Sequence, residues 1–517
     1  MRAVLLLALL AFAAGLVPLA LAAALGLDLP LGSDAPLWGL LVLDVRAGHP
    51  PTLPPLYGLL AAPLHLLGVS AGLAARLVSA GCLGLTVLFG GLAARALGGG
   101  RFGLLLAGLL LALHPDLLLS ALLTQPETAT AACFALVAWA LSAAAASPTP
   151  LRLALAAASA LPAFLVRETG LPLVGGLLLA LLLLGLRARR PGLALGLPVA
   201  ALLLFQLATS VLARALTTPL WAPPWSGRLD VLRMDREMTA EGIAPTYVSG
   251  HSMPWLPWNA EQVLAVTQTM VGALALEGQE RALAVARVTA LHTLVGGLDL
   301  LLLLGTGLLA LGLAARRRPA LLLSWLPALA LVLATLLIWS QRRHLAVLLP
   351  FGAAGLGLGI AAIRPLLPRL LLGAAAVLVV PVWQLPTTRA ALVELSVRAE
   401  HVRDAWILGR RLDAALPPDA RICGTWGREV IGARGVLLVG AQRAGCLAEG
   451  DLPTEPGGQP GWMAARLGEG QGPTGGTWVE IDRQGRFSVG WMEPSVGEEE
   501  RRQRAKLRPV ERYVPTP

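Results

Sequence analysis

The chain has 517 residues, of which 56% are hydrophobic and only 14% are charged, and its mean hydropathy is +0.69. This composition indicates an all-α polytopic membrane protein and excludes an ordinary soluble enzyme, because no soluble core needs so much continuous Leu and Ala. The net charge of +10 is carried largely by arginines in short clusters between apolar runs, which are typical topology signals, so no nucleic-acid partner is expected.

An apolar run over residues 3–27 predicts the first membrane helix, which is either retained as an anchor or cleaved like a signal peptide. Arg2 in front of this run places the N-terminus in the cytoplasm. The loop that follows, residues 28–71, is therefore expected on the outer side of the membrane.

The outer loop combines an acid with two short helices. Asp34 stands at the start of an amphipathic helix predicted over 36–47, and it is either a catalytic group or the cap of that helix. Four prolines between positions 50 and 55 then break the chain, and an apolar helix is predicted over 56–67. About 20 residues are needed to cross a ~30 Å hydrocarbon core, so 56–67 is expected to lie in the outer interface or to re-enter.

The remaining apolar runs predict about eleven membrane helices in total. This count places every dense arginine cluster inside, whereas counting 56–67 as a span would place all of them outside. After the first helix, the expected spans are 72–97, 101–117, 128–146, 150–166, 170–187, 191–216, 288–315, 319–339, 345–363 and 369–386.

The sequence divides into a membrane domain, residues 1–386, and a small outer α/β domain, residues 387–517. In the membrane domain, the outer loop 217–287 carries tryptophans that either anchor it at the membrane edge or cover an opening for substrates. In the second domain, an amphipathic helix is predicted over 391–416, followed by a hairpin that turns at Asp482–Gly485 and by a charged, mobile tail.

The four cysteines do not predict a definite disulfide pairing. Cys82 and Cys133 fall in apolar helices, where a small buried residue is the expected role. Cys423 and Cys446 fall in the outer domain, where they are either free thiols or a disulfide.

Residues 1–77 contain, in order, a membrane helix, the acid Asp34, an interfacial helix, the run G-H-P-P-T-L-P-P-L-Y (48–57), an apolar helix and A-A-R-L (74–77). This order resembles the GT-C membrane glycosyltransferases, in the branch of the protein O-mannosyltransferases and the lipid A aminoarabinose transferases. The resemblance implies that Asp34 is the catalytic carboxylate and that His49 and Tyr57 contact the substrate. The Glu that usually follows the family's Asp is replaced here by Ala35.

A second outer segment runs from His114 to Glu127. In the resembling family, an acidic motif of the T-E-P type stands here, before an apolar helix, and helps to bind or orient the substrates. This chain has T-Q-P-E instead, with Gln125 in place of the family's Glu, so the second acid is Glu127, is Asp116, or is absent. Glu127 alternatively stabilises the dipole of the helix that it begins.

Two groups of arginines are candidate phosphate ligands. Arg167 lies in a turn that resembles a short family motif, and Arg342, Arg343 and His344 resemble the family segment near the carrier phosphate. A guanidinium suits this role because it can donate two parallel hydrogen bonds to a phosphate. For Arg167 the alternative is an ion pair with Glu168, whereas an anionic ligand explains why outer-face arginines oppose the orientation rule.

The resemblance implies a mannosyltransferase-like enzyme that moves a hexose or pentose from a polyprenyl-phosphate donor to a glycan, lipid or protein acceptor. Its expected location is the bacterial inner membrane, with the C-terminal domain outside. The alternative is a transporter or flippase of lipid-linked glycans. Charge in helix centres would favour transport, but the predicted helices carry almost none, and Asp299 is the main exception. No metal-ligand or nucleotide motif is present, so no cofactor is expected, although a divalent metal stays open.

Overall fold

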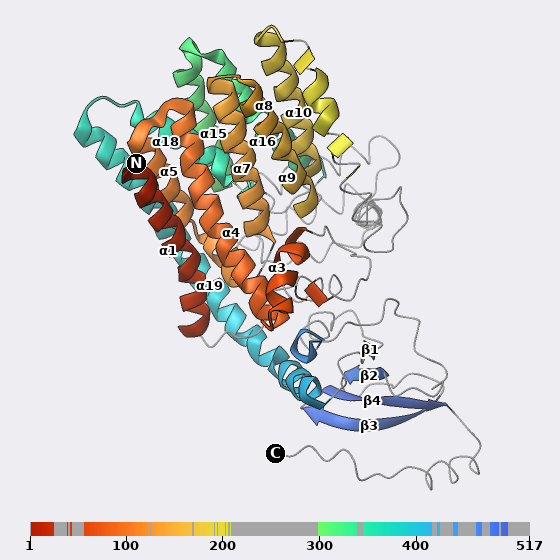
Figure 1. The fold of residues 1–517 in the computed structure, drawn as a ribbon. Coiled ribbons are helices and arrows are strands. Elements are labelled where there is room, and N and C mark those ends of the chain that lie inside the picture. Colours follow the sequence, from red (N-terminus) through yellow and green to blue (C-terminus); the bar gives the residue numbers. More distant parts are fainter. Residues whose placement is uncertain are drawn as a thin grey trace, which may run out of the picture.

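The computed structural model of the protein describes residues 2–24, 39, 42–43, 56–124, 126–167, 170–190, 192–193, 195–201, 203–204, 207, 298–338, 345–415, 421–423, 438–442, 462–467, 476–484 and 487–494. The predicted loop 217–287 and the charged tail lie outside these residues. Figure 1 shows an elongated helical bundle that one long helix connects to a small sheet.

Helices dominate the described chain, as the composition predicts. Three helical stretches are long and apolar enough to cross a membrane, namely Arg2–Ala24, Ala71–Ala112 and Glu127–Ala146, and the other apolar helices have 10–17 residues. The total of about eleven spans therefore stays a prediction. The helices are α1 (Arg2–Ala24), α3 (Leu56–Leu66), α4 (Ala71–Ala94), α5 (Gly100–Ala112), α6 (Pro115–Leu122), α7 (Glu127–Ala146), α8 (Pro150–Ala158), α9 (Ala160–Val166), α10 (Gly170–Arg187), α15 (Leu298–Ala314), α16 (Leu326–Ile338), α18 (Leu349–Ala361) and α19 (Leu366–Ala415).

Two of the predicted spans are not continuous helices in the structure, and a proline explains each difference. The run 101–117 already ends at Ala112, because Pro115 has no N–H to continue α5 and instead takes the first position of α6. The run 150–166 divides at Ser159 into α8 and α9, since Pro162 cannot donate the hydrogen bond that would extend α8.

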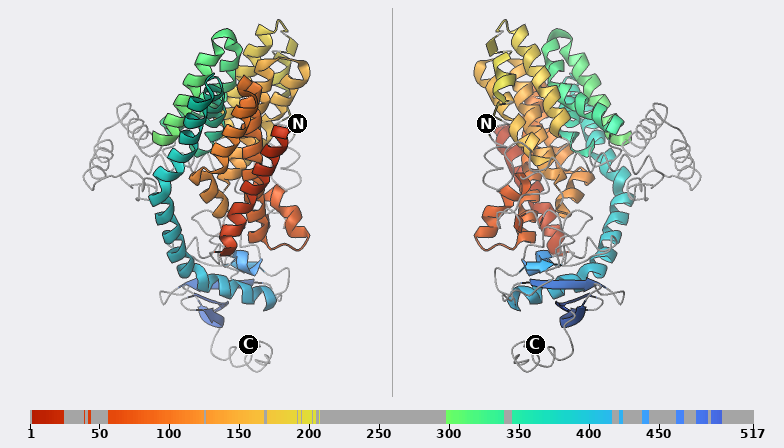
Figure 2. Two further views of the ribbon diagram at one scale, coloured as in Figure 1. Left: turned by 90° about the vertical axis from the view of Figure 1, so that its left-hand side faces the viewer. Right: turned by 90° about the vertical axis from the view of Figure 1, so that its right-hand side faces the viewer.

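Helix α19 is one continuous helix of 50 residues. The sequence predicts two separate elements here, a span over 369–386 and a helix over 391–416, and this separation is wrong. Pro381 and Pro386 each remove one backbone hydrogen bond, which bends a helix without necessarily ending it. Figure 2 shows α19 passing along the bundle and then bending to lie across the sheet.

The C-terminal strands form a mixed sheet in the order β1-β2-β4-β3. The strands are β1 (Arg421–Cys423), β2 (Trp462–Leu467), β3 (Gly476–Gln484) and β4 (Phe487–Pro494). The predicted hairpin is confirmed, but 482–484, expected in its turn, extend β3 instead, and Gln484 pairs with Phe487. Two residues then remain between the strands, the commonest hairpin loop length. The limits of a domain over 387–517 stay a prediction.

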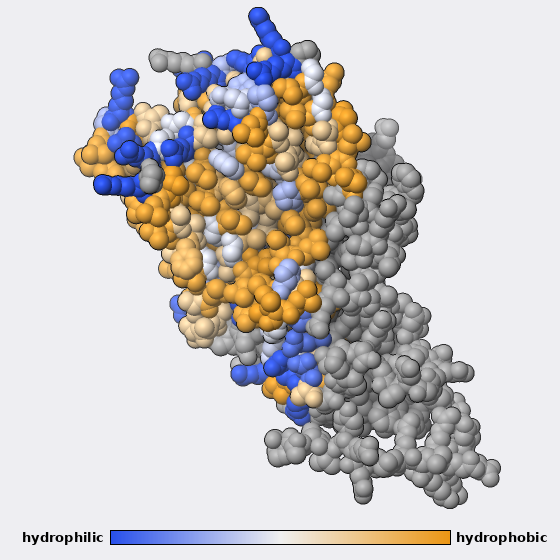
Figure 3. All heavy atoms as spheres, viewed as in Figure 1, coloured by the Kyte–Doolittle hydropathy of each residue, from blue (hydrophilic) through white to orange (hydrophobic). Residues whose placement is uncertain are grey.

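The outside of the bundle is apolar, as lipid contact requires. Leu5, Phe12 and Leu302 are 63%, 68% and 59% exposed. Figure 3 shows an apolar surface along the bundle, with hydrophilic residues gathered at its upper end. The chain is therefore a membrane protein.

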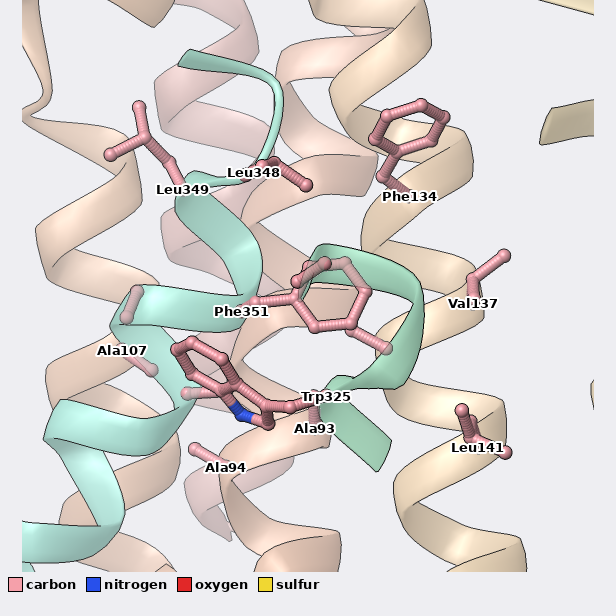
Figure 4. Close-up of a cluster of buried hydrophobic side chains, with 14 of the residues drawn as sticks. Ala93, Ala94, Ala107, Phe134, Val137, Leu141, Trp325, Leu348, Leu349 and Phe351 are labelled. Atoms are coloured by element: carbon pink, nitrogen blue, oxygen red, sulfur yellow. The ribbon is translucent and has the colours of Figure 1, made fainter. Parts of the chain in front are cut away.

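Inside the bundle, helices approach closely where small residues face each other. A Cβ on Gly307 of α15 would lie 2.6 Å from the carbonyl oxygen of Gly352 in α18, so no larger residue fits there. Such contacts suit association in lipid, where apolar burial does not drive helices together. In the core drawn in Figure 4, the rings of Trp325 and Phe351 meet edge to face, with centroids 6.2 Å apart.

Several described arginines lie at or near the C-terminal ends of α4, α7 and α10. Arg95 caps the C-terminus of α4, and Arg187 is the last residue of α10. Arg152 donates to the carbonyl oxygen of Ala143 near the end of α7, at 3.3 Å. Glu127 begins α7 and is therefore separated from these clusters by the length of that helix.

We expect positions 34, 225 and 478 to lie on the outer side of the membrane and positions 189 and 317 to lie on the cytoplasmic side, because arginine clusters are retained in the cytoplasm. Single cysteine substitutions at these positions, treated with a membrane-impermeant thiol reagent, measure this directly. Labelling of Arg317→Cys in intact cells, or of Trp478→Cys only after permeabilisation, would show that the orientation is reversed.

Candidate active site

Buried polar side chains gather where α3, α4, the start of α7 and the end of α9 meet. The residues of this polar cluster are at most 9% exposed, and they are Tyr57, Arg76, Ser79, Glu127 and Arg167. An ionisable side chain within a membrane bundle is costly to bury, so such a residue is by default a candidate for function.

The centre of the polar cluster is an ion pair between Glu127 and Arg167, in which the guanidinium Nη1 donates to the carboxylate Oε1. Glu127 is the first residue of α7, where an acid also stabilises the helix dipole. Arg167 follows the last residue of α9 in an extended conformation, which turns its side chain away from the helix path. Glu127 therefore stands where an acid stabilises the helix dipole, and the partner that the structure gives Arg167 lies 40 residues away in the sequence.

Tyr57 joins α3 to α4 beside this pair. Its hydroxyl donates to the carbonyl oxygen of Ala75 at 2.7 Å and lies 2.7 Å from the Oγ of Ser79. Tyr57 belongs to one buried cluster with Val166 and Ala129, which lie close to the ion pair in the sequence. Burial raises the pKa of the Tyr57 phenol, so the group stays a neutral hydrogen-bond donor.

Arg76 belongs to the polar cluster but was not selected as a site candidate from the sequence. It lies in the second turn of α4 and is 9% exposed. A single arginine within 24 otherwise apolar or small residues is a detectable signal, because such a residue in a membrane helix faces protein or a functional site.

His114 and Asp116 stand together at the start of α6. His114 is 4% exposed, and its Nδ1 lies 3.7 Å from the Oδ2 of Asp116, whose side chain is 21% exposed. The structure therefore brings Tyr57, Glu127 and Arg167 together and gives Asp116 a histidine neighbour.

The other predicted site residues lie outside the described part of the chain. These residues are Asp34, His49, Gln125, Arg342, Arg343 and His344. Within the described residues, no group of three or more His, Cys, Asp or Glu side chains is placed to hold a metal ion.

Thr124, just before the polar cluster, has a strained backbone. Its φ is 58°, a left-handed conformation that β-branched residues rarely adopt. The side chain is buried, and within the part of the chain that the structure describes its hydroxyl oxygen has no hydrogen-bond partner. Strain of this kind costs about 1–3 kcal/mol and is concentrated at functional sites.

Thr124→Asn should leave the melting temperature unchanged or raise it, because Asn adopts left-handed backbone conformations more readily than Thr. Thermal unfolding in detergent checks this, with transfer activity measured alongside. Thr306→Asn, in the regular helix α15, is the control and should show no gain. A clear fall in the melting temperature of Thr124→Asn alone would show that the threonine side chain stabilises this turn.

No protein-family model and no curated protein matches the chain. Among solved structures, it is similar to the Archaeoglobus fulgidus oligosaccharyltransferase in complex with zinc and sulfate, at a TM-score of 0.45 and 13% identity. That match covers 80% of this chain and 58% of the oligosaccharyltransferase, so the chain spans little more than half of that protein.

The chain is also similar to ArnT from Cupriavidus metallidurans. The apo structure matches at a TM-score of 0.39 and 16% identity, over 92% of this chain and 97% of ArnT. The structure bound to undecaprenyl phosphate matches at a TM-score of 0.43 and 15% identity, over 94% and 97%.

Proposed function

We propose that the chain is a membrane glycosyltransferase that moves a monosaccharide from a polyprenyl-phosphate donor to an acceptor hydroxyl or amine at the outer face of the inner membrane. The observation that carries this proposal is the polar cluster, in which the Glu127–Arg167 pair packs beside Tyr57. Tyr57 is the second residue of α3, the helix that follows the segment containing Asp34. The polar cluster therefore includes a residue that comes soon after that segment in the sequence.

In the proposed reaction, Asp34 takes the proton of the acceptor hydroxyl as the acceptor oxygen attacks the anomeric carbon. The bond from this carbon to the phosphate oxygen breaks, and polyprenyl phosphate leaves with the electron pair. General-base help of this kind is worth about 10²–10⁴-fold in rate. Positive charge on Arg342 and Arg343 stabilises the departing phosphate.

The Glu127–Arg167 pair is assigned a supporting role. Because both side chains are buried and bonded to each other, the charge of Arg167 is already compensated before a donor arrives. We therefore assign the donor phosphate first to Arg342 and Arg343. The pair holds the start of α7 against the end of α9.

Arg343→Ala should raise the KM for the donor about tenfold or more with little change in folding, since hydrogen bonds to a charged group contribute about 1.5–3 kcal/mol. Arg343→Lys should also weaken donor use, because a point charge cannot reproduce the guanidinium fork. Arg389→Ala, at an exposed position of α19, is the matched control. An unchanged donor KM in Arg343→Ala, with Arg342→Ala also normal, would assign both residues to structure.

A transporter of lipid-linked glycans was the alternative. Its main sequence support, Asp299, accepts a hydrogen bond from Gln384 Nε2 at 2.6 Å, and this bond ties the start of α15 to α19. That contact is what a structural residue would make, so it does not favour transport.

The experiment that tests the function is incubation of the purified protein in liposomes with polyprenyl-phosphate sugars radiolabelled in the sugar. We expect label to leave the lipid and to appear on an acceptor. Label that stays on the lipid while it crosses the bilayer would support the transporter instead.

A further inference from the structure

A short C-terminal segment, residues 438–442, packs directly on the N-terminal outer segment. Val439 is 1% exposed and belongs to an apolar cluster with Val42, Leu43, Ala61, Ala71 and Ala74. A Cβ on Gly39 would lie 2.8 Å from Val439 Cγ2, and a Cβ on Gly72 would lie 3.5 Å from Val439 Cγ1. The docking segment, as we call residues 438–442, therefore contacts both the predicted interfacial helix and the start of α4.

The other side of the docking segment is held by the last turns of α19. A Cβ on Gly440 would lie 3.1 Å from the carbonyl oxygen of Trp406. The Nε2 of Gln442 donates to the Oδ2 of Asp413 at 3.0 Å. Gln442 has a φ of 50°, a conformation that persists where surrounding contacts enforce it.

Three parts of the chain thus form one junction. The end of α19 holds the docking segment, and the docking segment covers Gly39, Val42 and Leu43. Gly39 carries no side chain at the point of closest approach, so Val439 sits directly on the backbone of the outer segment. Asp34 is five residues before Gly39 in the sequence. Movement of the docking segment would therefore be transmitted to the backbone at Gly39.

We propose that the docking segment positions the Asp34 segment for transfer, with Val439 as its positioning residue. This role rests on the proposed function, because it takes Asp34 as the base. Its physical reason is that reacting groups must be held in place, and a displacement of about 1 Å can cost about 10²-fold in rate.

Docking itself is tested by a disulfide. A Cβ on Gly39 would lie 3.7 Å from the Cβ of Val439, within the range of about 3.5–4.5 Å found in disulfides. Gly39→Cys with Val439→Cys, in a Cys423→Ser and Cys446→Ser background, is oxidised in membranes with copper phenanthroline. We expect a cross-link between the two peptides by mass spectrometry, reversed by dithiothreitol.

The control for this cross-link is Gly81→Cys with Val439→Cys, because nothing lies within 4 Å of a Cβ on Gly81. Gly72→Cys with Val439→Cys repeats the test from α4 if the Gly39 variant does not fold. A folded protein that forms neither the 39–439 nor the 72–439 cross-link would overturn the proposal.

The positioning role is tested by Val439→Asp, which places a charge in the apolar cluster and should release the docking segment. We expect kcat for transfer to fall about tenfold or more, and the donor KM to change less than about twofold, since the loss is one of orientation. Ile407→Asp, at a 36% exposed position of α19, is the matched control and should leave kcat near that of the wild type. The oxidised 39–439 variant should keep its transfer activity, because the disulfide replaces the apolar contact.

Two outcomes separate this inference from the proposed function. Normal kcat in a folded Val439→Asp protein would overturn the positioning role and leave the glycosyltransferase proposal standing. A wild-type protein that forms the cross-link but transfers no sugar would overturn the proposed function, and the positioning role with it, while the docking contact would stand.

Discussion

Asp34→Asn should fold and bind the donor but lose at least about two orders of magnitude in transfer rate, the lower end of general-base contributions. Asn caps a helix about as well as Asp, so the substitution keeps the structural role and removes the base. The measurement is single-turnover transfer of labelled sugar, with donor binding and melting temperature recorded for the same preparation.

Asp116→Asn is the companion variant, because Ala35 and Gln125 leave the second acid of this chain open. Asp116 lies beside His114 at the start of α6 and is partly exposed, so its removal should cost little stability. Wild-type transfer by Asp34→Asn, together with a large loss in Asp116→Asn, would move the catalytic role to the second outer segment.

Removal of either partner of the Glu127–Arg167 pair should destabilise the protein by about 3–5 kcal/mol, because a buried charge is left without its counter-ion. Glu127→Gln removes the carboxylate that is bonded to Arg167, and Arg167→Met removes the guanidinium that is bonded to Glu127. The double variant removes both charges and should recover most of the loss. Reversible unfolding in detergent, followed for the two single variants and the double variant, gives the coupling energy.

A solvent-exposed ion pair provides the control for this cycle. Arg410 and Asp413 are 3.4 Å apart, with side chains 51% and 24% exposed. Arg410→Gln should cost less than about 1 kcal/mol, as is usual for surface pairs. Near-neutral single variants at Glu127 and Arg167 would mean that the pair does not compensate buried charge.

The sequence was a good guide to the helices of the bundle, because long apolar runs and prolines act locally. The predictions for α7 and α10 are confirmed, with 128–146 expected and Glu127–Ala146 found for α7, and 170–187 expected for α10. It failed at α19, where the change from apolar to amphipathic composition near Pro386 was taken as a boundary. Hydrogen bonding continued through that change, so composition and helix limits do not coincide there.

The sequence alone predicted several residues of the candidate site, but it did not predict which of them contact each other. Glu127, Arg167 and Tyr57 were selected singly, but no periodicity relates residues on α3, α7 and α9, so their meeting required the tertiary structure. The same holds for Val439 on Gly39, which joins two ends of the chain. Arg76 could have been found, because its isolation in an apolar helix is visible in the sequence.

In the proposed transfer, the bond between the sugar and the lipid phosphate breaks, so one polyprenyl phosphate is released for each sugar transferred. This ratio can be measured in liposomes that contain the wild-type protein or Asp34→Asn, as free polyprenyl phosphate released per labelled sugar transferred. We expect equal amounts of both products with the wild type and almost none with Asp34→Asn. Passage of intact labelled lipid across the bilayer, with no free polyprenyl phosphate, would contradict it.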